Sequence, residues 1–241
     1  MPLGTPPERG ARSAEDAAAP RSALRAQPKL RGRLIWWAIF LGAATPGLYL
    51  AWQFWLAWNF QPNDLGKDPV EGIEHATGET AIRFLALTLA ITPVRQLTGW
   101  NWLAPYRRML GLFMFFYASA HLAVFYALDL EMNLGEVVTE IVKRPYITIG
   151  FAAWLLLVPL ALTSTKGWIR RLGGRRWNRL HKLTYAVALL GMVHFFWSQK
   201  KDMTDPLLFS LVFAALFGWR GWRAWQRRRA ADVRPAQERA A

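Results

Sequence analysis

Histidine is the residue type in this chain whose number and spacing indicate chemistry. The 241-residue sequence contains four histidines, His75, His121, His181 and His194, and no cysteine. Imidazole is a common ligand of heme iron, and a histidine inside an apolar helix is costly unless it has a partner. The absence of cysteine excludes disulfides, iron–sulfur clusters, thiolate zinc sites and thioether-linked heme.

Two of the histidines lie at matching depth in apolar segments. His121 follows Arg108 by 13 residues, and His194 follows His181 by the same number. Because an α-helix rises about 1.5 Å per residue, both would lie about 20 Å from the basic end of their helix. Two imidazoles on facing helices can bind one heme iron from its two sides. The sequence therefore predicts heme b, with His121 and His194 as iron ligands.

Three further residues are candidates for binding a cofactor. His181 can bind a second heme nearer the basic end, although a spacing of 13 places it about 220° around the helix from His194. Its counterpart on the facing helix is Arg108, which suits a heme propionate better than iron. Arg83, just inside another apolar segment, is a candidate propionate partner at the first heme.

Each histidine also has a plainer interpretation. His121 and His194 can each donate a hydrogen bond to a neighbouring helix. His181 can be one basic residue among many at a membrane surface. His75 precedes an apolar segment, so we expect it to be solvated or, alternatively, to cover the edge of the heme or face a quinone.

Six apolar segments would hold these residues in place. They cover residues 34–63, 76–97, 109–128, 145–165, 183–199 and 206–219, the last extending to about 225. A helix of about 20 residues spans the hydrocarbon core of a bilayer. The second and sixth segments need arginines that reach the membrane surface, and either can instead be an interfacial or buried helix. The predicted fold is all-α: a six-helix transmembrane bundle in one domain, residues 33–225.

The distribution of charge predicts the orientation. The net charge is +14, and most of the 30 Lys and Arg lie in the two tails and in the loops 95–108 and 166–182. The positive-inside rule then places both termini in the cytoplasm. We expect residues 1–32 to be a disordered basic cytoplasmic tail and residues 226–241 a second basic tail. The charge fits membrane topology and contact with lipid, and no nucleic-acid-binding or nucleotide-binding motif accompanies it.

Several short motifs occur in order along the chain. They are AITPVR at 90–95, RRMLGL at 107–112, RPYITIG at 144–150, LTST at 162–165, RWNRLHKLTY at 176–185 and HFFWS at 194–198. With His121, this run from about residue 34 to 222 resembles the MsrQ family, the heme-binding subunits of periplasmic methionine sulfoxide reductase systems. The element WNRLH alone resembles only the wider ferric-reductase transmembrane domain.

The resemblance implies a multi-pass protein of the bacterial inner membrane with a ferric-reductase-like transmembrane domain. It implies one or two molecules of heme b at His121, His181 and His194, with FMN as a further cofactor. Family members take electrons from the respiratory quinone pool, or from a cytoplasmic flavin donor. They pass them to a periplasmic molybdenum-cofactor enzyme that reduces methionine sulfoxide in oxidised proteins. This chain would then be an electron-transfer subunit, and the catalytic sulfoxide site would lie on the partner.

Two other functions are compatible with the sequence. The first keeps the heme and changes the partner: a ferric reductase or another quinol-linked membrane anchor. The second is a heme-free transporter or assembly scaffold, for which broken helices at mid-membrane would be typical. Pro46 and Pro159, inside apolar segments, are the features that favour it.

Overall fold

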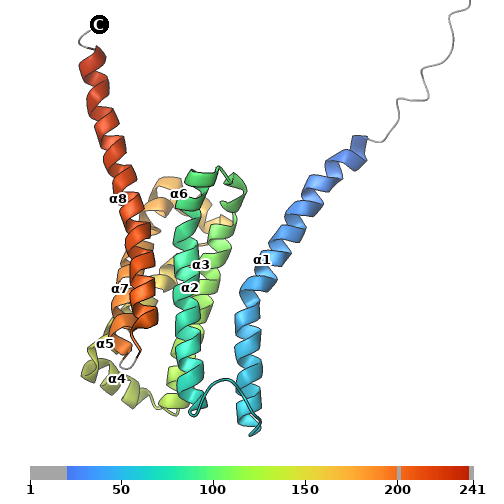
Figure 1. Cartoon of the computed structure of the whole chain (residues 1–241), viewed down its shortest axis with the longest axis vertical. Helices are drawn as coiled ribbons and strands as arrows, with labels where there is room; N and C mark the ends of the chain where they lie inside the picture. Colours follow the sequence, from blue (N-terminus) through green and yellow to red (C-terminus); the bar gives the residue numbers. More distant parts are fainter. Residues whose placement is uncertain (1–20, 200–201, 239–241) are drawn as a thin grey trace, which may run out of the picture. The chain divides into compact units, whose positions relative to one another are not determined.

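The chain is built from helices (Figure 1). The computed structural model describes residues 21–199 and 202–238, with side chains placed for 30–199 and 202–231, and these residues contain no strand. The helices are α1 (Arg21–Trp58), α2 (Pro69–Thr98), α3 (Tyr106–Val124), α4 (Leu134–Lys143), α5 (Pro145–Leu162), α6 (Lys166–Leu180), α7 (Leu183–Ser198) and α8 (Thr204–Glu238), with a 3-10 turn η1 (Asn101–Leu103) and a π-helical turn η2 (Phe125–Asp129). The all-α prediction is confirmed, and the six predicted segments correspond to α1, α2, α3, α5, α7 and α8.

The two predicted tails differ from the structure in part. Residues 1–20 and 239–241 lie outside the described residues. α1 begins at Arg21 and α8 continues to Glu238, so helices extend into both predicted tails. The cause is composition, because Ala, Arg, Leu, Lys and Gln, which dominate these stretches, are strong helix formers. The chain divides into two units, and the boundary after Gly42 falls inside α1.

The chain is a membrane protein. Three helical stretches are long and apolar enough to cross a bilayer by length and composition: Leu30–Trp58, Tyr106–Asp129 and Pro145–Leu162. α7 is also apolar but shorter. Large apolar side chains such as Leu48, Leu155 and Leu211 are at least half exposed, as expected where lipid replaces water. Six spans with both termini in the cytoplasm stay a prediction.

In the second unit, α2, α3, α5, α7 and α8 run side by side (Figure 1). α4 lies at one end of this bundle and α6 at the other, and we refer to these as the α4 end and the α6 end. α2 packs most extensively on α3, and α5 on α7. The core between them is apolar and includes side chains with almost no exposure: Leu89, Tyr117, Val187, Ala188 and Phe213.

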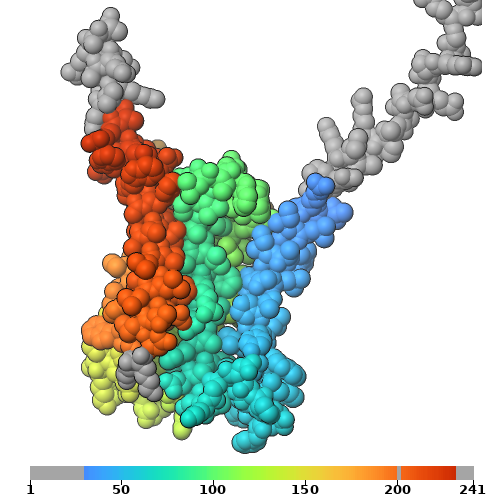
Figure 2. Space-filling view, in the orientation of Figure 1, coloured from blue at the N-terminus to red at the C-terminus, as the bar shows by residue number. Residues whose placement is uncertain are grey.

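α8 is joined to α2 by polar contacts near the α6 end. The Trp219 indole donates to Gln96 Oε1 at 3.0 Å, and the Arg220 guanidinium donates to the Leu89 carbonyl. The space-filling view shows α8 lying directly along α2 (Figure 2). Membrane helices gain little from apolar contact alone, so such hydrogen bonds help to hold them together.

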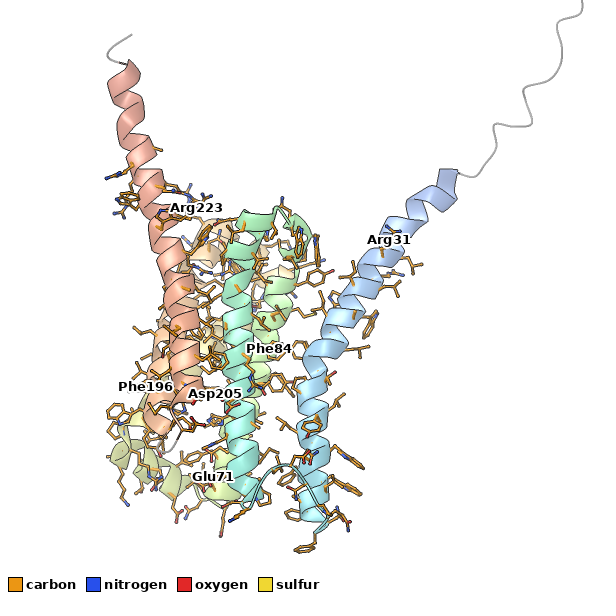
Figure 3. All side chains as sticks on the ribbon, viewed as in Figure 1. Arg31, Glu71, Phe84, Phe196, Asp205 and Arg223 are labelled. Carbon is orange, nitrogen blue, oxygen red and sulfur yellow. The ribbon has the colours of Figure 1, made fainter. Side chains whose placement is uncertain are left out.

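Local signals determine where α2 begins and ends. The Asp68 carboxylate accepts hydrogen bonds from the backbone N–H groups of Val70 and Glu71, and Pro69 occupies the first helical position. Gly99 ends the helix in the left-handed conformation, with φ of 74°. These are typical helix start and stop signals. They place Glu71 at the α4 end and Phe84 midway along the helix (Figure 3).

Candidate functional site

His121 on α3 and His194 on α7 face each other inside the bundle. Their ring centroids lie 6.1 Å apart, with the ring planes at 70°. An imidazole nitrogen lies about 2 Å from a first-row metal ion that it binds, so two rings on opposite sides of one iron have centroids about 6 Å apart. The two histidines predicted from helix depth are therefore brought together at the separation that bis-histidine heme binding requires.

Each ring forms a hydrogen bond to a backbone carbonyl, and this bond determines which ring nitrogen is free to bind a metal. His121 Nδ1 lies 2.9 Å from the Glu74 carbonyl on α2, and His194 Nδ1 lies 2.7 Å from the Tyr146 carbonyl on α5. A carbonyl only accepts, so each Nδ1 must carry the proton, and each Nε2 keeps its lone pair. Metal-binding histidines typically donate their other N–H in this way.

A cavity of about 700 Å³ surrounds the pair. This volume lies in the range typical of cofactor pockets. Apolar side chains from five helices line most of it, among them Ile82, Leu85, Met114, Phe125, Val137, Ile141, Phe151, Leu157 and Phe195. The residues therefore suit a large, flat, mostly apolar cofactor held by two imidazoles.

Charged side chains line the cavity toward the α4 end. They include Glu71, Glu74, Asp129 and Arg144. Burial, reinforced by the charges of Asp129 and Glu71, raises the pKa of Glu74 to about 7, and Arg144 opposes this shift. Among the described residues, the mouth of the cavity thus holds the cation Arg144 and several carboxyl groups.

Arg144 is held in place by two contacts. Its Nε lies 2.6 Å from Glu140 Oε2, and its Nη1 lies 3.3 Å from the Tyr146 hydroxyl. Tyr146 is also the residue whose carbonyl binds His194, so the arginine is tied to the backbone that supports this ligand.

Known proteins are similar in sequence to this chain over most of its length. Residues 77–192 match the family model described as ferric reductase like transmembrane component. A protein-methionine-sulfoxide reductase heme-binding subunit MsrQ from Xanthomonas oryzae pv. oryzae is 51% identical over 202 residues, which cover 84% of this chain and 92% of that protein. The MsrQ subunit of Xanthomonas euvesicatoria pv. vesicatoria is 53% identical over 191 residues, covering 79% and 87%. That of Herminiimonas arsenicoxydans is 48% identical over 168 residues, covering 69% and 77%.

The chain belongs to the MsrQ family. The ferric-reductase match ends at residue 192, just before His194. The recognition of the family from its motifs is confirmed.

The structure places His181 apart from the histidine pair. It follows α6, and its ring stacks on Trp177 with centroids 3.8 Å apart. Its Nε2 lies 3.3 Å from Thr163 Oγ1. Burial, with a smaller effect of Arg107, lowers the pKa of His181. Arg108, its predicted counterpart, is exposed.

Arg83 lies outside the cavity. Its side chain is 56% exposed and pairs with Glu79 at 2.8 Å. The reason is helix geometry: Ile82 and Leu85 face the cavity, and Arg83 is turned about 100° from its neighbour Ile82. His75, by contrast, is exposed at the cavity mouth, where it was expected to lie if it covers the edge of a cofactor.

Sequence reasoning missed three kinds of residue at the site. Arg144 was named only as the first residue of a motif, although it directly precedes Pro145, a helix-start signal that places it at the N-terminus of α5. The carbonyl groups of Glu74 and Tyr146 leave no signal in the sequence. The glycines that contact the two histidine rings were not singled out in the sequence.

Proposed function

We propose that the chain binds one heme b between His121 and His194 and relays electrons through it across the inner membrane. The observation that carries the proposal is the pair of imidazoles 6.1 Å apart, each with its Nδ1 held by a backbone carbonyl. Relatives are named heme-binding subunits, which supports the same cofactor here.

Bound heme would supply one-electron chemistry between ferric and ferrous iron. The residues of the chain hold the two ligands, keep them in one tautomer and surround the site with apolar side chains that exclude water. Arg144 would provide a positive charge for a heme propionate at the mouth. These contacts adjust binding and potential, whereas the redox change belongs to the cofactor.

The count of histidines supports a single bis-histidine heme. The chain has four histidines, and His75 and His181 lie at opposite ends of the bundle. They cannot face each other across one iron, so a second heme at His181 would need a ligand other than histidine.

The proposed acceptor is a methionine sulfoxide reductase, in agreement with the names of the relatives. By family resemblance it is a periplasmic molybdenum-cofactor enzyme, and the α4 end would face it. This orientation follows from the basic residues of α6 itself and of the connection 95–108, which favour the cytoplasmic side.

The proposed donor is the quinone pool or a cytoplasmic flavin donor, with FMN as a further cofactor of the α6 end. Support comes from half-buried arginines on three helices there: Arg95, Arg107 and Arg220. Arg107 interacts electrostatically with both Arg220 and Arg95, so the three guanidinium groups lie near one another. Such a group of cations suits an anionic ligand, a flavin phosphate or a lipid headgroup.

Absorption spectra of the purified full-length protein in detergent test the proposal. The oxidised and dithionite-reduced forms should show the bands of a six-coordinate b-type cytochrome, and a pyridine hemochrome assay should give one heme per chain. His121→Ala and His194→Ala should each remove the low-spin signal. A colourless wild-type protein after heme supplementation would favour a scaffold or transporter instead.

A further inference from the structure

Each of the two facing histidines lies directly against a glycine of the neighbouring helix. A methyl group added at Gly78 of α2 would lie 3.2 Å from His121 Nδ1 and Cε1. One added at Gly150 of α5 would lie 2.7 Å from His194 Nδ1 and 2.8 Å from its Cε1. Carbon and nitrogen in van der Waals contact lie about 3.5 Å apart or more, so neither glycine position admits a side chain without displacing the ring.

Each carbonyl that binds a histidine ring belongs to a residue four positions before one of these glycines. Glu74 precedes Gly78 by four residues, and Tyr146 precedes Gly150 by four. In an α-helix this carbonyl is the one that receives the N–H of the residue four positions later. A side chain on that later residue covers the carbonyl from the side, because Cβ atoms point toward the helix N-terminus. Glycine leaves it open to the imidazole.

The same arrangement therefore occurs twice, once in the α2–α3 pair and once in the α5–α7 pair. Gly111, another helical glycine of this bundle, serves as a comparison. A methyl group at Gly111 of α3 would meet only the Thr88 methyl group, at 3.7 Å, which is ordinary contact. Small residues at membrane helix interfaces usually serve backbone packing, whereas Gly78 and Gly150 contact the ligand rings themselves.

We propose that Gly78 and Gly150 are positioning residues for the heme ligands: each opens a backbone carbonyl to one imidazole and thereby directs its Nε2 into the cavity. The inference rests on the proposed function, and it adds the residues that determine ligand orientation. Gly150 leaves less room for a side chain than Gly78, because a methyl group there would lie closer to the histidine ring. Each glycine acts through its histidine and touches neither substrate nor iron.

The test compares Gly150→Ala, Gly78→Ala and the control Gly111→Ala in the full-length, heme-loaded protein. We expect Gly150→Ala to lower the fraction of low-spin ferric heme at least twofold and to shift the midpoint potential. Gly78→Ala should act in the same direction but less, and Gly111→Ala should match wild type. Electron paramagnetic resonance and redox titration report on bound heme only, so lower yield alone does not imitate the effect. Wild-type spectra and potential in Gly150→Ala would overturn the proposal.

A double-mutant cycle separates the ring contact from helix packing. If Gly150 makes room for the His194 ring, Gly150→Ala should lower the melting temperature of the wild type. It should not lower that of the His194→Ala variant, in which no imidazole lies against residue 150. An equal loss in both backgrounds would show that the glycine serves packing and would overturn the proposal.

The proposed function can fail separately. If His121→Ala and His194→Ala keep the wild-type spectrum, the heme lies elsewhere and both proposals are wrong. If they lose it while Gly150→Ala and Gly78→Ala behave as Gly111→Ala does, only the role of the glycines is wrong.

Discussion

The hydroxyl of Tyr117 on α3 accepts a hydrogen bond at 2.8 Å from the backbone N–H of Gly47 on α1. The same hydroxyl donates to the Ala43 carbonyl, also at 2.8 Å. In a regular α-helix these two backbone groups, four residues apart, bond to each other. Tyr117 is inserted between them next to Pro46, a proline inside α1, and only 1% of Tyr117 is exposed.

Replacing Tyr117 by phenylalanine should therefore destabilise the bundle without changing the heme spectrum. The change leaves a backbone donor and acceptor of α1 without their partner in an apolar environment, at a cost of about 1–3 kcal/mol. Thermal unfolding in detergent would measure the loss.

Tyr106→Phe is the matched control for this change. Tyr106 is also a buried tyrosine of α3, and its hydroxyl forms no hydrogen bond with the described residues. Equal stability of the two variants would show that the inserted hydroxyl contributes nothing.

Arg144 should influence the midpoint potential of the heme, and Arg83 should not. Arg144 lines the cavity, and a positive charge there favours the reduced state, which carries one more electron. Arg144→Gln should lower the potential by about 40 mV, equivalent to about 1 kcal/mol for one electron. Potentiometric titration of both glutamine variants measures the difference. A larger shift in Arg83→Gln would instead favour the arginine chosen from the sequence.

The contrast between these two arginines shows what the sequence can predict. Depth along a helix follows from residue number, because the rise per residue is constant. The meeting of His121 and His194 could therefore be predicted. Rotation about the helix axis depends on packing, and it turns Arg83 away from the cavity although its depth is suitable.

The backbone carbonyls that bind the two imidazoles could not be predicted, for a related reason. A backbone carbonyl is present at every residue, and only tertiary packing selects those of Glu74 and Tyr146. α4 was not predicted for a different reason. Its apolar stripe is too short to span a bilayer, so a search for membrane spans overlooks it.

α4 should shield the cavity from water. Ile141 lines the cavity, whereas Val138 on the same helix is 63% exposed and does not. Ile141→Ser should lower the midpoint potential by a few tens of mV, about 0.5–1 kcal/mol, because access of water favours the more highly charged ferric state. Val138→Ser carries a similar loss of apolar volume on the same helix and should leave the potential unchanged. Equal shifts in the two variants would show that α4 does not seal the site.

His181→Ala should leave the low-spin signal of the His121–His194 pair intact. His181 packs on Trp177 and Thr163 at the α6 end, and the remaining histidine, His75, lies at the α4 end. One heme per chain should therefore persist, while a modest loss of stability, about 1 kcal/mol, follows from the lost stacking and hydrogen bond. A pyridine hemochrome assay, normalised to protein, gives the ratio. A fall to half of a wild-type ratio of two, with the remaining spectrum unchanged, would contradict the single-heme proposal. It would place a second heme at His181 with a ligand other than histidine on its opposite side.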